Sequence, residues 1–349
     1  MKLKQLLWAL AIISISFACS DSSEERPLGK YENGILIMNE GSFGSNDGEV
    51  YHLNPSTEEL LPNIFEAENN RPFAGLLEDM VRVGDRLYLV ANTGKVEIVN
   101  AGTFKSTGTV ANDLDQPRSL AVNGNKLFIS DYGPYDDSYG TPDSYIAVVN
   151  GLDGGAVSKK IDVSNKPGDL YAHGNFILVA GTEENKIEII DATQEAVTST
   201  IELDASPRAF YAEDGILWVY AVTPTEVIFY TINLSSLTLG NTYTVPVTKP
   251  TGRIIFDGDD RMYIVTSSDW PEYNDAIFAI EIEGSTVTAT ELMTGSGFYG
   301  IGFDDERDEI YVANSNAFQG NGTVTVLSES GSVVRTFEVG RGPSGFLVY

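Results

Sequence analysis

A repeated pattern of short apolar segments constrains the fold of this chain more than any other feature of its 349 residues. Pro72, Pro117, Pro167, Pro207, Pro250 and Pro343 recur at intervals of 45, 50, 40, 43 and 93 residues, and Gly297 divides the last interval into 47 and 46. After each marker come an apolar segment, a turn with Gly or Asp, and a second apolar segment such as RLYLVAN, KLFISD or EIYVANS. A third segment such as KIEIIDA and a fourth such as TSTIEL complete each unit.

Four short antiparallel strands repeated about every 40–50 residues are typical of a β-propeller blade. Six complete units fill residues 71–339, and residues 33–66 contain GILIMNE, EVYHLNP and ELLPNIF, which match a second, third and fourth strand. The final GPSGFLVY matches the missing first strand. The sequence therefore predicts an all-β, seven-bladed β-propeller over residues 33–349, closed by N- and C-terminal strands that share one blade. A solenoid is the weaker interpretation, because it needs polar end caps rather than complementary half-units.

The N-terminus has the composition of an export signal. Lys2 and Lys4 precede an apolar run that ends at residue 18, which is too short and too N-terminal for a membrane span. Cys19, the single cysteine, resembles the acylated cysteine of a bacterial lipobox, although Ser16 and Phe17 stand where that pattern has Leu and a small residue. The alternative is ordinary signal cleavage beside an incidental cysteine. Residues 19–32 are polar and acidic, which predicts a flexible tether.

The charge balance excludes one class of partner. The chain has 50 acidic and 22 basic residues and a formal net charge of −28. A surface of this sign repels phosphate backbones, so we expect no nucleic-acid partner. Because no other segment is long and apolar enough to span a bilayer, we expect a soluble, monomeric body attached to the membrane through its lipid.

Two stretches carry a family resemblance. The C-terminal IYVANSNAFQGNGTVTVLSESGSVVRTFEVGRGPSGFLVY resembles the YVTN family of propeller repeats. The segment ILIMNEGSFGSNDGEVYHLNP, followed by NNRPFAG, resembles a Bacteroidetes-type group of surface lipoproteins, and the acidic run after Cys19 resembles their export signal. That group includes propellers that capture cobalamin (vitamin B12) and pass it to a TonB-dependent outer-membrane transporter. The resemblance implies an outer-membrane, lipid-anchored protein that faces the cell surface and has such a nutrient and such a transporter as partners.

Aromatic and polar residues gather in loops that a propeller would bring to one face. Loops from the second to the third strand of a blade share a face with the connectors between blades, and we call this face the loop face. Residues 129–150, ISDYGPYDDSYGTPDSYIAVVN, contain one such loop, about ten residues longer than GTEEN in the next unit. The candidate ligand-binding residues in these loops are Asn39, Phe43, Asp131, Tyr132, Tyr135, Tyr139, Trp270, Tyr273, Asn314 and Phe318. Aromatic side chains with polar neighbours suit a large, partly apolar ligand, whereas the alternative is that each aromatic covers its own blade.

Arginines recur beside the markers that begin the blades. These candidates are Arg71, Arg118, Arg208, Arg253 and Arg341, all on the same predicted face. Guanidinium groups around an axial funnel would donate forked hydrogen bonds to phosphate, carboxylate or amide oxygens of a ligand. An arginine at a repeated position can equally tie neighbouring blades together, and both interpretations stay open.

Signs of catalytic or metal chemistry are sparse. Aspartates at positions 131, 136, 137 and 143 could coordinate Ca²⁺, but their spacing does not match an EF-hand, and a solvated acidic loop is the preferred interpretation. The two histidines lie in no ligand-spaced cluster, and no nucleophile motif or phosphate-binding loop is present. We therefore expect a ligand-capture protein that is not an enzyme and has no resident cofactor, with cobalamin as its candidate ligand. Capture of a siderophore, haem or glycan, a protein-binding scaffold, and a lyase or lactonase are the alternatives.

Overall fold

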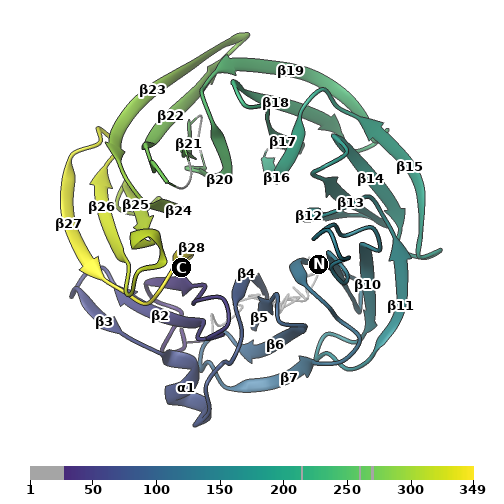
Figure 1. Cartoon of the computed structure of the whole chain (residues 1–349), viewed down its shortest axis with the longest axis horizontal. Coiled ribbons are helices and arrows are strands. Elements are labelled where there is room, and N and C mark those ends of the chain that lie inside the picture. Colours follow the sequence, from purple (N-terminus) through teal and green to yellow (C-terminus); the bar gives the residue numbers. More distant parts are fainter. Residues whose placement is uncertain (1–26, 214, 259–260, 269–270) are drawn as a thin grey trace, which may run out of the picture.

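The computed structural model describes residues 27–213, 215–258, 261–268 and 271–349, and these form a ring of seven four-stranded antiparallel sheets (Figure 1). The predicted seven-bladed propeller is therefore confirmed. The predicted signal peptide, Cys19 and Trp270 lie outside the described residues. None of the helices in the described part of the chain has the length and apolar character needed to cross a bilayer.

Each blade runs from an inner strand at the axis to an outer strand at the rim. Blade 1 contains β28 (Pro343–Val348), β1 (Ile35–Asn39), β2 (Glu49–Asn54) and β3 (Glu59–Leu61). Blades 2 and 3 contain β4 (Leu77–Val83), β5 (Arg86–Ala91), β6 (Lys95–Asn100), β7 (Ser106–Val110), β8 (Pro117–Asn123), β9 (Lys126–Asp131), β10 (Tyr145–Asn150) and β11 (Val157–Asp162). Blades 4 and 5 contain β12 (Pro167–His173), β13 (Phe176–Gly181), β14 (Lys186–Asp191), β15 (Ala196–Glu202), β16 (Ser206–Glu213), β17 (Ile216–Val222), β18 (Glu226–Asn233) and β19 (Thr238–Pro246). Blades 6 and 7 contain β20 (Pro250–Phe256), β21 (Arg261–Thr266), β22 (Asp275–Glu283), β23 (Thr286–Gly295), β24 (Phe298–Asp304), β25 (Glu309–Asn314), β26 (Thr323–Ser328) and β27 (Val333–Glu338).

The hydrophobic core lies between neighbouring blades. Second strands such as β5, β9 and β13 are buried along almost their whole length, because both faces of the blade pack against another sheet. Tyr88 of blade 2 packs in one cluster with Ile129 of blade 3, and Tyr311 of blade 7 packs in another with Ile37 of blade 1. Outer strands such as β23 alternate between exposed and half-buried residues, since one of their faces meets solvent. The apolar runs of the repeat are thus the layers between blades.

The ring closes where the two ends of the described chain meet. Strand β1 pairs antiparallel with β28, with Ile37 opposite Phe346, and the Tyr349 amide donates to the Gly34 carbonyl at 3.0 Å. In Figure 1 the C-terminal strand lies at the axis beside the start of the propeller. This pairing confirms the predicted shared blade and leaves no sheet edge open at the junction.

The N-terminal region departs from the sequence prediction in two places. The ELLPNIF segment forms only the short strand β3 before Pro62 and then begins helix α1 (Ile64–Asn69), in which buried Phe65 packs edge-on against Phe73 at 5.6 Å. The tether predicted through residue 32 ends earlier, because Tyr31 and Glu32 are buried. The ring of Tyr31 contacts His52 and Phe104 edge-on, so the last tether residues belong to the packed body.

Candidate functional site

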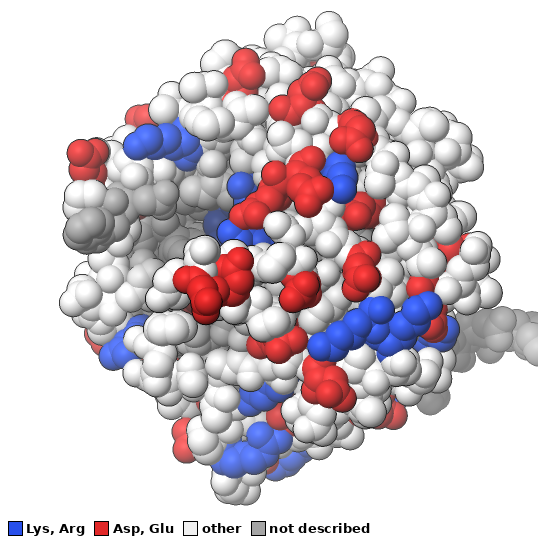
Figure 2. All heavy atoms as spheres, turned by 45° about the vertical axis from the view of Figure 1, so that its right-hand side comes forward, with Lys and Arg blue, Asp and Glu red and all other residues white. Residues whose placement is uncertain are grey.

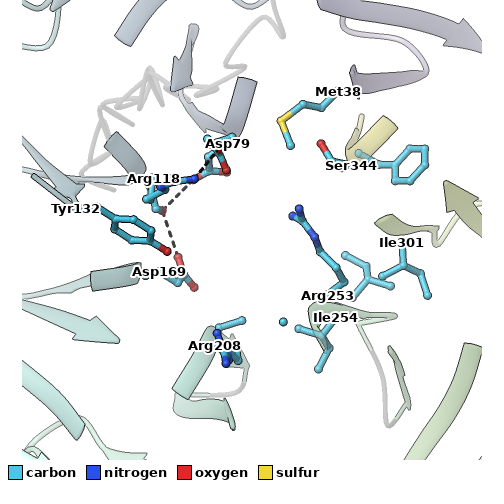
Figure 3. Close-up of a pocket in the computed structure, with 18 residues that line it drawn as sticks. Met38, Asp79, Arg118, Tyr132, Asp169, Arg208, Arg253, Ile254, Ile301 and Ser344 are labelled. Atoms are coloured by element: carbon cyan, nitrogen blue, oxygen red, sulfur yellow. Dashed lines mark hydrogen bonds and ion pairs between the residues drawn. The ribbon is translucent and has the colours of Figure 1, made fainter. Parts of the chain in front are cut away.

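All seven inner strands line one cavity of about 400 Å³ at the axis of the ring. Residues near the start of β4, β8, β12, β16, β20, β24 and β28 contribute to its wall, together with Met38 of β1 and Tyr132 of the β9–β10 loop. We call this space the axial cavity. Figure 3 shows its labelled side chains reaching toward a common space from different blades.

A β-bulge near the start of every inner strand positions these side chains. The pairing register shifts between Leu77 and Asp79 in β4, between Pro117 and Ser119 in β8, and at the corresponding place in the other blades. The residues that the register skips are Glu78, Arg118, Gly168, Asp169, Arg208, Thr251, Gly252, Arg253, Tyr299 and Ser344. A bulged residue leaves the ladder and its side chain is re-aimed, which is a common device beside binding sites. In this ring the bulges turn polar side chains toward the axis.

Three of the five candidate arginines lie in the axial cavity. Arg118 forms a 2.7 Å ion pair with Glu78, and its guanidinium lies 4.1 Å from the centroid of the Tyr132 ring. Arg208 and Arg253 form no ion pair with any carboxylate in the described part of the chain. Two guanidinium groups are therefore available to an anionic group inside the cavity.

Two carboxyl groups share a hydroxyl group on the cavity wall. The Oγ of Ser119 lies 2.8 Å from Asp79 Oδ2 and 3.4 Å from Asp169 Oδ1, and the Phe210 amide donates to Asp169 Oδ2 at 2.8 Å. Burial raises the pKa of Asp79 to about 7, and the nearby charge of Asp169 adds to the effect while the Ser119 hydrogen bond opposes it. Burial likewise raises the pKa of Asp169 to about 6. The pair consequently holds a proton more readily than free aspartates do.

A third protonatable carboxyl group, that of Glu40, lies beside Tyr299 of the inner strand β24. Tyr299 Oη donates to Glu40 Oε2 at 2.7 Å. Burial raises the pKa of Glu40 to about 7, with a further contribution from the charge of Glu78. The three guanidinium groups stay charged while these carboxyl groups take up protons, so the cavity is more basic than the protein around it. Figure 2 shows Lys and Arg side chains within a hollow of the surface and acidic side chains around it.

A second cavity of about 390 Å³ adjoins the axial cavity between blades 6 and 7. We call it the side pocket. Arg253 lines both spaces, and the side pocket is also lined by Tyr273 and Phe318 from the β21–β22 and β25–β26 loops. The ring of Phe318 meets Tyr299 edge-on at 5.0 Å. The structure thus brings Arg253, Tyr273 and Phe318, three residues predicted from the sequence, into one neighbourhood.

The other two candidate arginines lie outside both cavities. Arg71 pairs with Glu97 of β6 at 2.6 Å and lies over the Phe65 ring. Arg341 pairs with Asp47 of the β1–β2 loop at 3.5 Å. Their contacts match the structural interpretation of the repeated arginine, whereas Arg208 and Arg253 form no ion pair in the described part of the chain.

The short polar residues at the ends of second strands form hydrogen bonds with backbone groups of the nearby loops. Asp131 is fully buried and accepts hydrogen bonds from the amides of Asp115, Gln116 and Gly133 at 2.8–2.9 Å. Asn39 is also buried and donates to the Glu49 carbonyl, while the Asn314 side chain donates to the carbonyl of Ser296. The hydrogen bonds of these three side chains therefore stabilise the loops around them.

The geometry of the acidic loop bears on the Ca²⁺ interpretation. Both oxygens of Asp131 face amide donors, and Asp136 Oδ1 accepts from the amides of Ser138 and Gly140. Over the described ranges, no group of three or more His, Cys, Asp or Glu side chains is placed to hold a metal ion.

Three predicted aromatics stand on the surface of the loop face. Phe43 is 93% exposed, Tyr139 is 81% exposed and Tyr135 is 51% exposed. The Tyr135 and Tyr139 rings meet edge-on at 6.3 Å. None of the three lines the axial cavity, and their exposed rings are accessible to a ligand on this face.

Sequence reasoning missed the acidic half of the site. Glu40, Glu78, Asp79 and Asp169 were not among the candidates, nor were Ser119 and Tyr299, whose hydroxyl groups hydrogen-bond to three of them. A signal was present, since LLEDM and PGDLY place charged residues within segments that begin predicted inner strands. A charged residue at such a position needs a polar surface inside the ring.

Residues 33–339 match the family model described as "Domain of unknown function (DUF5074)". The chain belongs to this family. None of the curated protein sequences matches the chain.

Solved structures resemble the chain in fold. A quinonprotein alcohol dehydrogenase-like protein from Bacteroides thetaiotaomicron has a TM-score of 0.66 and 14% identity over 91% of this chain and 78% of its own. A functionally unknown protein from Desulfotomaculum acetoxidans has a TM-score of 0.63 and 10% identity over 90% of this chain and 98% of its own. Kuenenia stuttgartiensis hydrazine synthase has a TM-score of 0.56 and 19% identity over 75% of this chain and 86% of its own. At these identities the likeness concerns the propeller architecture.

Proposed function

We propose that this protein captures a bulky ligand at its loop face and binds an anionic group of that ligand in the axial cavity. The observation that carries the proposal is the pair of cavity arginines, Arg208 and Arg253, that lack carboxylate partners in the described part of the chain. Arg208 is exposed on the cavity wall and Arg253 is half-buried there, so both guanidinium groups can form a forked ion pair with an anionic ligand group. A rigid ring also presents these groups preformed, so little ordering entropy opposes binding.

The size and lining of the site support a large ligand that is only partly enclosed. A volume of about 400 Å³ lies within the range of small-molecule sites. Met38, Ile254 and Ile301 supply an apolar part of the wall opposite the polar groups. A ligand larger than the cavity would leave a portion outside, where the exposed Tyr135, Tyr139 and Phe43 can contact it.

Cobalamin is the ligand that we propose within this class. It is bulky, it has a negatively charged phosphodiester for the arginines, and its amides can hydrogen-bond with the polar wall. The N-terminal resemblance to surface lipoproteins supports the same ligand, and with it a lipid anchor at Cys19, an outer-membrane location and delivery to a TonB-dependent transporter.

Calorimetric titration of the purified full chain with cyanocobalamin tests the proposal. We expect one-to-one binding, and we expect Arg208→Gln to weaken it roughly 10- to 100-fold, because a hydrogen bond to a charged group contributes about 1.5–3 kcal/mol. Arg86→Gln is the matched control, since Arg86 pairs with Asp153 at 2.8 Å at the turn between β4 and β5, away from the loop face. Absence of heat, with an unchanged Tm, would exclude cobalamin. Equal affinity in wild type and Arg208→Gln would exclude the axial cavity.

The carboxyl pair favours one alternative function, acid–base catalysis on a bound ligand. Asp79 has a pKa raised to about 7 and faces Asp169 across Ser119, and perturbed carboxyl pairs of this kind occur in active sites. A screen with lactone and glycoside substrates decides between the functions. Turnover that disappears in Asp79→Asn would establish catalysis, whereas our proposal expects binding of a ligand that is released unchanged.

A further inference from the structure

We propose that the side pocket between blades 6 and 7 binds a planar aromatic group whose anionic substituent is held by Arg253. The inference rests on the proposed function, because Arg253 belongs to both the side pocket and the axial cavity. It adds a chemical class: a ligand that has a flat ring within a few bonds of a carboxylate, phosphate or sulfonate group.

Aromatic side chains dominate the wall of the side pocket. Phe298, Tyr299 and Phe318 come from blade 7, and Tyr273 comes from the β21–β22 loop of blade 6. Phe298 is buried, and Phe318 meets Tyr299 edge-on with ring centroids 5.0 Å apart. Such walls offer both ring faces and ring edges, which favours a planar π-system over a branched aliphatic group.

The cation at the boundary of the two cavities is oriented by an aromatic ring. The Arg253 guanidinium lies 5.0 Å from the Tyr299 ring centroid, a cation–π contact that helps to fix its position. Tyr299 is held in turn by its hydrogen bond to Glu40. No carboxylate in the described ranges lies within ion-pair distance of Arg253, and Glu40 and Glu78 act on its charge only from further away. An anion beside the bound ring would therefore be its first close ionic partner.

The loop that bears Phe318 has an uncommon backbone conformation that favours a preformed pocket. Asn316, Ala317 and Phe318 have positive φ angles of 50°, 50° and 61°, which non-glycine residues adopt only when the surroundings hold them. Gly342 helps to hold the ring, because a Cβ there would lie 2.9 Å from Phe318 Cε1. The ring is thus placed before any ligand arrives, which reduces the entropy lost on binding.

A titration of the full chain with 2-naphthoate, followed by calorimetry, tests the subsite, and acetate serves as the ring-free comparison. We expect 2-naphthoate to bind and acetate to bind at least tenfold more weakly. Phe318→Leu and Arg253→Gln should each weaken 2-naphthoate binding at least fivefold. Tyr243→Leu is the matched control, because Tyr243 is a half-buried aromatic on the outer strand β19 and lines neither cavity. Tyr273→Leu provides an independent test if the thermal unfolding of Phe318→Leu shows that this variant is misfolded.

The outcomes separate this inference from the proposed function. Equal binding of 2-naphthoate and acetate, or unchanged 2-naphthoate binding in the folded Phe318→Leu and Tyr273→Leu variants, overturns the aromatic subsite. If cyanocobalamin binding still depends on Arg208, the proposed function is supported although the aromatic subsite is not. Conversely, Phe318-dependent binding of 2-naphthoate by a chain that does not bind cyanocobalamin supports the subsite and contradicts cobalamin as the ligand.

Discussion

At the scale of single residues, the axial carboxyl groups couple the fold to pH. Burial and the charge of Asp169 raise the pKa of Asp79 to about 7, and burial raises the pKa values of Glu40 and Glu49 to about 7. A carboxyl group with a raised pKa binds its proton more tightly in the folded than in the unfolded chain. The contribution of these groups to the free energy of unfolding therefore decreases as the pH rises from about 4 to about 7, where they lose protons in the folded state.

Asp79→Asn should remove part of this pH dependence. Asparagine keeps the shape but has no charge to bury, so the Tm of the variant should exceed that of the wild type by about 2 °C or more at pH 8 and match it near pH 4. Asp191→Asn is the control of opposite sign, because backbone hydrogen bonds from Gln194 and Thr193 lower the pKa of Asp191 in an exposed turn. Thermal unfolding from pH 4 to pH 8 checks both. A difference between Asp79→Asn and wild type that does not grow with pH would contradict the assignment.

At the scale of elements, close approach of the inner strands determines how tightly the ring closes around the cavity. A Cβ at Gly300 of β24 would lie 2.5 Å from the backbone of Ser344 in β28, and one at Gly302 would lie 2.7 Å from Phe346. These glycines have room for the neighbouring strand only because they lack a side chain. Together with the bulges, this contact sets the width of the axial cavity.

Gly300→Ala should therefore destabilise the propeller. The added methyl group forces β24 and β28 apart, and overpacking of this kind costs roughly 1–3 kcal/mol. Gly252→Ala is the matched control on the inner strand β20, since the nearest atom to its added Cβ is Arg208 Cδ at an ordinary 3.6 Å. Denaturant unfolding of the two variants measures the difference. Similar losses of stability in both variants would show that contact with β28 is not the reason why Gly300→Ala destabilises the protein.

At the scale of the whole molecule, the ring depends on one strand from the far end of the chain. Strand β28 is the inner strand of blade 1, and its Ser344, Gly345 and Phe346 also line the axial cavity. Without it the backbone of β1 would be an open edge at the axis, which invites pairing with another chain.

Deletion of residues 343–349 should open the ring. We expect Tm to fall by at least about 10 °C or the protein to aggregate, because a whole ladder and the blade 1 contacts with β24 are lost. Addition of a synthetic peptide of residues 341–349 should restore part of the stability through β-strand addition. Size-exclusion chromatography and thermal unfolding provide the readout. Wild-type stability in the truncated chain would contradict a closing role for β28.

The sequence by itself determined the architecture, because each strand of a blade has a local pattern of apolar residues. Strands such as KLFISD and FILVAG are apolar because both faces of their blade are buried. Their recurrence at a regular spacing, with turns between them, can be recognised in a single sequence. The same local logic located Arg118, Arg208 and Arg253, since each follows a repeated marker. It could not separate them from Arg71 and Arg341, which have the same spacing but different partners.

Only the tertiary structure decided which side chains meet. The bulges that turn Arg208 and Arg253 inward are offsets in pairing between strands, and no residue type in the sequence encodes them uniquely. The Asp79–Ser119–Asp169 contact joins three successive blades whose residues lie 40 and 50 positions apart, so it exists only when those blades pack side by side. Strand identity follows from short-range burial patterns, whereas the site depends on where distant strands cross the axis.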